Sequence, residues 1–161
     1  MKIQRTISKT LKSWKNSPTR KPLVLQGARQ VGKTWLLKNF GMEEFESMAY
    51  FNFDSQPELK QFFSTTKDTK RLIQNLSLVH GKTILPEKTL VIFDEIQECN
   101  EALNTLKYFC EDSPEYCIAC AGSLLGVAMS RGASFPVGKV DFINVHPVSF
   151  KEFLSVSDAK L

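Results

Sequence analysis

Short apolar runs and amphipathic stretches alternate along the 161-residue chain. Apolar runs of this kind are typical of buried strands, whereas apolar residues recurring every three or four positions indicate helices that bury one face. The strand-like runs lie at 23–26, 48–53, 90–95, 116–121 and 137–145. Helical patterns lie at 3–15, 35–38, 57–80, 101–110 and 124–129, and a capping box at 149–152 opens a last helix. This alternation predicts an α/β fold whose parallel strands are joined by right-handed crossovers.

The helical patterns predict which positions face the core. The helix at 3–15 has one apolar stripe with lysines opposite, so we expect it to dock on the domain; the stripe consists of Ile3, Ile7, Leu11 and Trp14. The apolar positions of the helical material at 57–80 are Leu59, Phe62 and Phe63 on one stretch and Leu72, Ile73, Leu76 and Val79 on the next. Gly41 is the expected C-cap of the helix that begins near residue 35, because glycine enters the left-handed conformation without steric cost.

The stretch from Gly27 to Thr34 has the spacing G-x-x-x-x-G-K-[ST] and lies between a predicted strand and a predicted helix. This is the pattern of the phosphate-binding loop, or Walker A motif, of P-loop NTPases. Its glycines let successive N–H groups point inward, and the helix N-terminus behind them favours an anion. We expect Lys33 to reach the β- and γ-phosphates and the Thr34 hydroxyl to bind Mg²⁺. The predicted nucleotide-binding residues are Gly27, Ala28, Arg29, Gln30, Val31, Gly32, Lys33, Thr34 and Trp35.

The apolar run at 90–93 ends in two acids, Asp94 and Glu95. This pattern describes a strand buried on both faces that delivers carboxylates at its C-terminal edge, where open α/β sheets bind ligands. We expect Asp94 to hold Mg²⁺ and Glu95 to polarise the hydrolytic water, as in a Walker B motif. Such a pair can also merely cap a strand end, but the P-loop upstream favours the catalytic interpretation.

ATP is the expected nucleotide, because two features of a Ras-type GTPase are missing. Such a GTPase needs a glycine three positions after the strand-end Asp, and position 97 is Gln. Its guanine-specificity motif should follow this strand, whereas the nearest string, Thr66-Lys67-Asp68, precedes it with the wrong spacing.

Two residues near the expected site each have two interpretations. Ser123 follows the strand at 116–121, so it either contacts the γ-phosphate or attacking water, or serves as an N-cap or turn serine. Trp14 either lies near the adenine or fills the seam between its helix and the core, and we favour the seam.

Size and composition limit the class of protein. A chain of 161 residues with 42% hydrophobic content allows one domain with a sizeable core. The chain contains neither an apolar run of about 18 residues nor a signal-peptide core, so we predict a soluble, cytoplasmic protein without a membrane partner.

Cys117 and Cys120 spell C-x-x-C, but residues three apart on a strand point to opposite faces, which favours buried thiols over zinc ligands.

The net charge of +4 is unevenly distributed, because residues 1–42 contain ten Lys and Arg residues and no acid. Part of this excess belongs to the expected phosphate site. The remaining cations form either a solvated helix face or a surface for a polyanion such as nucleic acid; they are Lys9, Lys12, Lys15, Arg20 and Lys21. We favour the solvated face, because no nucleic-acid motif accompanies them.

Taken together, the motifs resemble those of the AAA+-like ATPases of bacteria and archaea, in the same order and over nearly the whole chain. They lie at 27–34, 93–97, 121–124, 135–139 and 147–153. The resemblance implies a P-loop NTPase fold: a three-layer α/β/α sandwich with a mainly parallel five-stranded sheet in the order 5-1-4-3-2. It implies Thr34 and Asp94 at Mg²⁺, Glu95 as the catalytic glutamate acting with Lys33, and Ser123 as sensor. Many relatives have Gly-Arg at 138–139, where this chain has Gly-Lys, and lysine lacks the planar fork of an arginine finger.

Relatives of this kind are commonly longer, so the chain looks like an N-terminal ATPase core. The expected domains are an N-terminal helix and linker at 1–20, the core at 21–146 and the start of a C-terminal region at 147–161. The leading hypothesis is Mg²⁺-dependent ATP hydrolysis. One alternative is an ATP-dependent switch with little hydrolysis that engages a protein partner or itself through the C-terminal region. Another is a nucleic-acid-associated loader or motor. A phosphotransferase is least favoured, because only Arg71 and Arg131 follow the P-loop.

Overall fold

The computed structural model describes residues 7–123 and 136–149, and five parallel strands form one sheet within them. The strands are β1 (Leu23–Gln26), β2 (Ser47–Asn52), β3 (Thr89–Asp94), β4 (Cys117–Ala121) and β5 (Asp141–Asn144). Their order across the sheet is β2-β3-β4-β1-β5, with every neighbouring pair parallel. The predicted α/β class and strand order are therefore confirmed.

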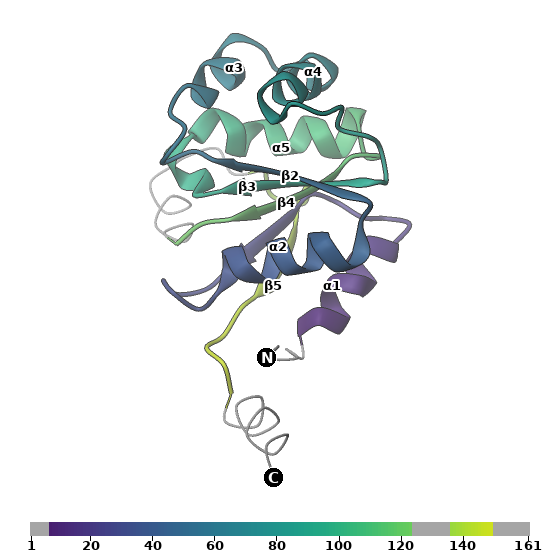
Figure 1. Ribbon diagram of the computed structural model, residues 1–161, viewed down its shortest axis with the longest axis vertical. Helices are drawn as coiled ribbons and strands as arrows, with labels where there is room; N and C mark the ends of the chain where they lie inside the picture. The colour runs from purple at the N-terminus through teal and green to yellow at the C-terminus, as the bar shows by residue number, and fades with distance from the viewer. Residues whose placement is uncertain (1–6, 124–135, 150–161) are drawn as a thin grey trace.

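Helices cover both faces of this sheet, which gives three layers (Figure 1). On one face lie α3 (Leu59–Thr65), α4 (Thr69–His80) and α5 (Asn100–Asp112), and on the other lie α1 (Ile7–Asn16) and α2 (Lys33–Glu44). A short 3-10 helix, η1 (Ile96–Glu98), joins β3 to α5. No helix in the described part of the chain is long and apolar enough to cross a membrane. Ile3, Arg131, the predicted helix at 124–129 and the helix opened at 149–152 fall wholly or partly outside the described residues.

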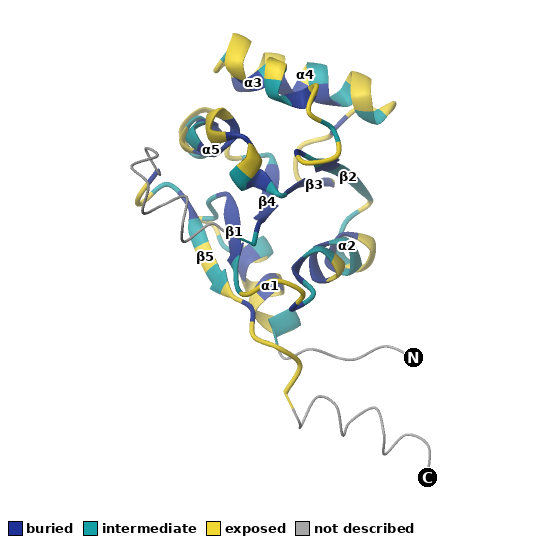
Figure 2. Ribbon diagram, turned by 90° about the vertical axis from the view of Figure 1, so that its left-hand side faces the viewer, coloured by how far each residue is buried: buried dark blue, intermediate teal, exposed yellow. Residues whose placement is uncertain are grey.

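Each face of the sheet buries its own hydrophobic core, and the central strands are the most buried part of the molecule (Figure 2). Strand β3 is buried at every position, as its unbroken apolar run predicts. Cys117 and Cys120 belong to opposite cores, which confirms the expectation that the C-x-x-C thiols point apart. Burial raises the pKa of both thiols, that of Cys117 to about 11. Both cysteines therefore act as apolar core residues at neutral pH.

Trp14 fills the seam between α1 and α2. Its side chain is 6% exposed, its ring centroid lies 6.4 Å from that of Phe40, and its indole N–H donates to the Lys21 carbonyl at 2.8 Å. This packing confirms the structural interpretation of Trp14 and explains how the stripe on α1 docks.

One helical prediction was wrong. Gly41 does not end α2, which continues to Glu44. A Cβ at Gly41 would lie 2.9 Å from the Met48 sulfur, so glycine serves there to let the helix approach β2 closely. Val79 is 43% exposed, because the last turn of α4 extends past the core. The C-cap of α4 is Gly81, which has a φ of 80°.

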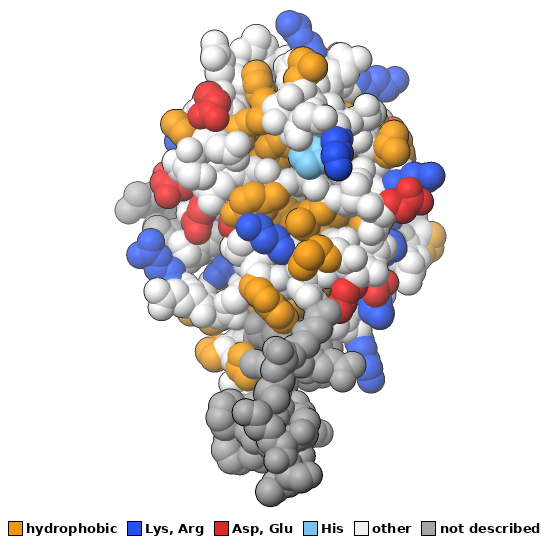
Figure 3. Space-filling view, in the orientation of Figure 1, with side chains coloured by type: hydrophobic (Ala, Val, Ile, Leu, Met, Phe, Trp, Pro, Cys, Tyr) orange, Lys and Arg blue, Asp and Glu red, His pale blue; other side chains and the backbone are white. Residues whose placement is uncertain are grey.

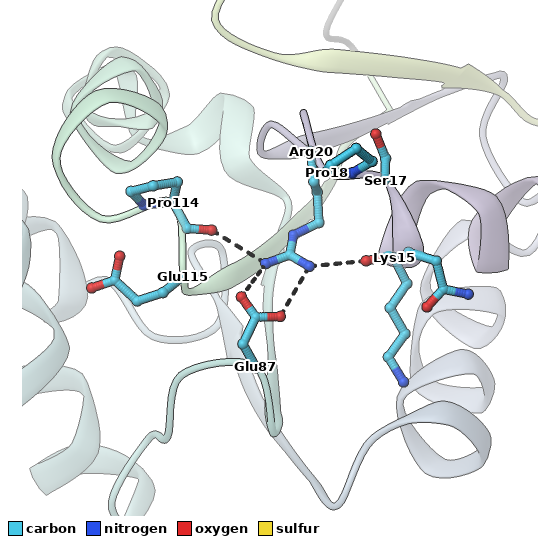
Figure 4. A pocket seen from close by; sticks show the side chains of 8 residues that line it. Lys15, Ser17, Pro18, Arg20, Glu87, Pro114 and Glu115 are labelled. Atoms are coloured by element: carbon cyan, nitrogen blue, oxygen red, sulfur yellow. Dashed lines mark hydrogen bonds and ion pairs between the residues drawn. The ribbon is translucent and has the colours of Figure 1, made fainter.

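The N-terminal ends of the strands, here called the amino edge, are tied together by Arg20 (Figure 4). Its guanidinium donates to both carboxylate oxygens of Glu87, at 2.8 and 3.2 Å, and to the carbonyls of Lys15 at 2.9 Å and Pro114 at 3.2 Å. The Arg20 side chain is 10% exposed, so the prediction of a solvated cation is wrong at this position. Arg20 instead joins the end of α1 to the loops that precede β3 and β4.

Other cations near the N-terminus also contact acceptors of the protein. The Lys12 ammonium lies 2.9 Å from the Glu44 carboxylate, and that of Lys15 donates to the Glu44 carbonyl. Lys139, which precedes β5, pairs with Glu111 at 3.1 Å, also at the amino edge and therefore at the opposite end of the sheet from the P-loop. Figure 3 shows the face over the edge strand β2, where hydrophobic side chains and basic side chains lie side by side.

Candidate functional site

Loops that follow β1, β3 and β4 surround a cavity of about 350 Å³ at the opposite, C-terminal ends of the strands, here called the carboxyl edge. The cavity brings together most of the predicted site residues. It is lined by Arg29, Gln30, Gly32, Lys33, Thr34, Trp35, Asp94, Glu95, Gly122 and Ser123. The other predicted residues, Gly27, Ala28 and Val31, complete the loop, and Val31 is buried beneath it.

The loop after β1 depends on residues with unusual backbone angles. Gly27 has a φ of 155°, and a Cβ there would lie 2.4 Å from the Val145 carbonyl oxygen, so no other residue fits without movement of the backbone. Gln30 and Gly32 have φ values of 60° and 87°. Helix α2 then starts, with the Leu36 N–H donating to the Gly32 carbonyl at 2.9 Å. The loop thus leads directly to a helix N-terminus, which favours negative charge.

The ammonium of Lys33 folds back onto this loop. It donates to the carbonyls of Gly27 at 2.8 Å and Ala28 at 2.6 Å, and the residue is 7% exposed. Burial lowers the pKa of Lys33, while the nearby charges of Glu95 and Asp94 act in the opposite direction. Within the described residues, the Lys33 ammonium is thus hydrogen-bonded to neutral acceptors, and it places a positive charge beside the cavity.

Asp94 faces Lys33 from the end of β3 and accepts three hydrogen bonds. Its Oδ2 accepts from the Thr34 hydroxyl at 2.8 Å and from the Tyr50 hydroxyl at 2.6 Å, and its Oδ1 accepts from the Glu95 N–H at 3.0 Å. Asp94 is 4% exposed. A buried carboxylate is stable only with such partners, so its orientation is well defined.

Glu95 leaves the strand with a left-handed backbone, at a φ of 50° and a ψ of 43°. A non-glycine residue in this conformation costs on the order of 1 kcal/mol, and such residues cluster at functional sites. The turn places the Glu95 carboxylate in the cavity wall, where it accepts a hydrogen bond from the Gln97 side-chain amide. Ser123 lines the same cavity from the end of β4.

Three residues near the site were not predicted from the sequence. Tyr50 contacts Asp94, Gln97 contacts Glu95, and Asn52 contacts Tyr50. Burial and the hydrogen bond to Asp94 raise the pKa of Tyr50 to about 12. The available signal was the alternation of polar residues 50 and 52 along β2, but their importance depends on β2 lying next to β3.

The parallel sheet, the phosphate-loop geometry and the acidic strand end define a P-loop ATPase of the AAA+ type. The model of one family, described as an AAA domain, matches residues 19–154, and this chain belongs to that family. The search of curated proteins finds no match.

Solved structures share the fold at low sequence identity. A STAND ATPase with a tetratricopeptide repeat sensor from Pyrococcus horikoshii aligns with 99% of this chain at 13% identity and a TM-score of 0.57. AMPPCP-bound DnaA from Aquifex aeolicus and Aeropyrum pernix ORC1 in complex with DNA each align with 96% of the chain, at 15% and 12% identity and TM-scores of 0.51. This chain spans 26%, 48% and 47% of those three proteins. These likenesses show the fold alone.

Proposed function

We propose that this chain binds ATP with Mg²⁺ at the carboxyl edge and hydrolyses it to ADP and phosphate. The observation that supports this most directly is that the cation Lys33 and the acid Asp94 line one cavity. Lys33 lies against its own loop carbonyls, and Thr34 is hydrogen-bonded to Asp94 across the gap between β1 and β3. Phosphate oxygens can replace the loop carbonyls as acceptors of the Lys33 ammonium and so gain charge-assisted hydrogen bonds.

The donor set suits Mg²⁺. The ion prefers hard oxygen ligands, keeps several waters and is usually held by one or two protein groups together with substrate phosphates. Thr34 and Asp94 offer a hydroxyl and a carboxylate at 2.8 Å from one another. Among the described residues, no group of three or more His, Cys, Asp or Glu side chains forms a self-sufficient metal site. Bound there, Mg²⁺ would neutralise phosphate charge.

The other residues around the cavity are assigned roles from where they lie in its wall. Backbone N–H groups of the loop and the start of α2 bind the phosphates, and Lys33 stabilises the charge that develops as the bond to the leaving β-phosphate oxygen breaks. Glu95 orients a water for in-line attack on the γ-phosphorus and accepts a proton from it. Ser123 contacts the γ-phosphate from the end of β4. Trp35, 47% exposed and part of the cavity wall, lies against the nucleotide.

A second function is favoured by one observation: the Glu95 carboxylate is already engaged by Gln97. A carboxylate held in this way must be released before it can orient water, so the protein could act as an ATP-dependent switch with slow hydrolysis. The hypothesis of nucleic-acid binding gains no support from α1, since Lys12 and Lys15 already contact acceptors of the protein.

The test separates binding from chemistry with Glu95→Gln. The amide keeps the shape of the side chain but cannot accept a proton, so phosphate release should fall by about 100-fold or more while ATP binding persists. Exposed Glu98 on η1 provides the control, and Glu98→Gln should leave phosphate release unchanged. Hydrolysis by Glu95→Gln at the parental rate would refute its catalytic role, and slow turnover by the parent despite tight ATP binding would favour the switch.

A further inference from the structure

Tyr50 connects the edge strand β2 to the acid at the end of β3. Its phenolic oxygen lies 2.6 Å from Asp94 Oδ2, the same oxygen that accepts from Thr34. The parallel register places Tyr50 beside Ile92 and Asn52 beside Asp94. The Lys38 ammonium lies 3.8 Å from the centre of the Tyr50 ring. The ring is thus fixed by the strand, by the cation above it and by its hydroxyl.

The direction of the Tyr50 hydrogen bond is set by Asn52. The Asn52 side-chain oxygen accepts from the backbone N–H groups of Asp54 at 2.9 Å and Ser55 at 3.0 Å. Its amide nitrogen therefore faces the Tyr50 oxygen, at 3.3 Å, and donates to it. Because the phenol has a single proton and the Asn52 amide only donates toward it, that proton is directed to Asp94.

We propose that Tyr50 is a positioning residue that keeps the Asp94 carboxylate oriented for Mg²⁺, an inference that rests on the proposed function. Thr34 hydrogen-bonds Asp94 in this structure, but its hydroxyl would turn to the metal. The Glu95 N–H would then hold Oδ1 and the Tyr50 hydroxyl would hold Oδ2. Outer-shell partners of this kind commonly determine metal affinity through the orientation of the ligand.

Tyr50→Phe removes only the hydroxyl and leaves the ring in its packing. With the protein saturated by a non-hydrolysable ATP analogue, Mg²⁺ is titrated and the tryptophan fluorescence is followed, to which Trp35 in the cavity wall contributes together with the buried Trp14. The Mg²⁺ concentration at half-maximal response should rise by about 10-fold. Affinity for the analogue in EDTA should stay at the parental value, because Tyr50 does not line the phosphate cavity. Tyr116→Phe, which removes a phenol at the amino edge, should change neither quantity.

The outcomes distinguish the inference from the proposed function. If the parent does not bind the analogue, the proposed function fails. If the parent requires Mg²⁺ and Tyr50→Phe has the same requirement, the positioning role alone is refuted. Equal weakening with and without Mg²⁺ would also refute it, since that pattern indicates a general structural role.

If Tyr50→Phe does not fold, the inference can be tested by ¹⁹F NMR of the protein with all its tyrosines in place. The protein is prepared with 3-fluorotyrosine at its three tyrosines, and ¹⁹F NMR spectra are recorded with the analogue before and after Mg²⁺ addition. The resonance of Tyr50 should shift on Mg²⁺ addition, while those of Tyr108 and Tyr116 stay in place. An unchanged Tyr50 resonance would overturn the proposal.

Discussion

The two edges of the sheet both concentrate charge, but they use it differently. At the amino edge, Arg20 has four protein acceptors, including both oxygens of Glu87, so most of its hydrogen-bonding capacity is used within the fold. At the carboxyl edge, the hydrogen bonds of Lys33 within the described part of the chain go to two carbonyls of its own loop, and the acids opposite it line a cavity. The first arrangement stabilises the fold, whereas the second leaves a cation available to an anionic ligand.

This difference shows that a buried cation is not by itself a sign of function. Arg20 and Lys33 are both largely buried and both come from the basic N-terminal part of the chain. What distinguishes them is the partner: a carboxylate neutralises Arg20, while Lys33 has neutral acceptors that a phosphate can replace with a gain in free energy.

The largest expected effect is on ligand binding at the carboxyl edge. Lys33→Ala should weaken ATP binding by about 100-fold or more, equivalent to about 3 kcal/mol, because the phosphates lose their main cationic side chain. Thermal stability should change little, since the freed carbonyls can hydrogen-bond water. Lys70→Ala, on the exposed surface of α4, is the control. Undiminished affinity of Lys33→Ala in calorimetry would refute the P-loop assignment.

At the amino edge, a substitution should lower the stability of the fold and leave ATP binding unchanged. Arg20→Met should lower the free energy of unfolding by about 2 kcal/mol, because two charged hydrogen bonds and two to carbonyls are lost at once. Its ATP affinity should match that of the parent. The pair of exposed Lys12 and half-buried Glu44 offers a control, and Lys12→Met should cost less than about 0.5 kcal/mol in denaturant unfolding. A similarly small loss in Arg20→Met would show that the amino edge is not stabilised by this cluster.

Two glycines with positive φ sharpen the comparison further. Gly81 has open space around the position of a Cβ, so Gly81→Ala should cost only the backbone strain of about 1 kcal/mol and leave ATP binding intact. Gly27→Ala should cost more stability and also weaken ATP binding, because its Cβ would meet the Val145 carbonyl. Equal effects of the two substitutions on stability and binding would contradict this account of the loop.

Patterns in the sequence were sufficient for the α/β class and for most residues around the cavity. Phosphate loops and acidic strand ends are local patterns, and the carboxyl ends of parallel strands meet at one edge whatever the details of packing. The resemblance to AAA+-like ATPases supplied the order of the strands, which local patterns do not determine.

Contacts between distant segments could not be predicted in this way. The bonds from Tyr50 to Asp94 and from Arg20 to Glu87 join residues 44 and 67 positions apart and depend on the final geometry of neighbouring loops. Gly41 was mistaken for a cap because its real constraint, the close approach of Met48, comes from another strand. Local patterns indicate what a segment prefers, whereas its neighbours decide what it contacts.

Hydrogen exchange with and without a Mg²⁺-bound, non-hydrolysable ATP analogue tests the central claim most directly, because it compares both edges in one experiment. The account predicts slower exchange at 27–35 and 94–95 on ligand binding, since loop amides bind phosphate and the acidic strand end becomes enclosed. Exchange at 86–88 and 113–116 should stay the same, since these segments are tied by Arg20 in either state. Unchanged exchange in the loop, or protection confined to the amino edge, would contradict the account.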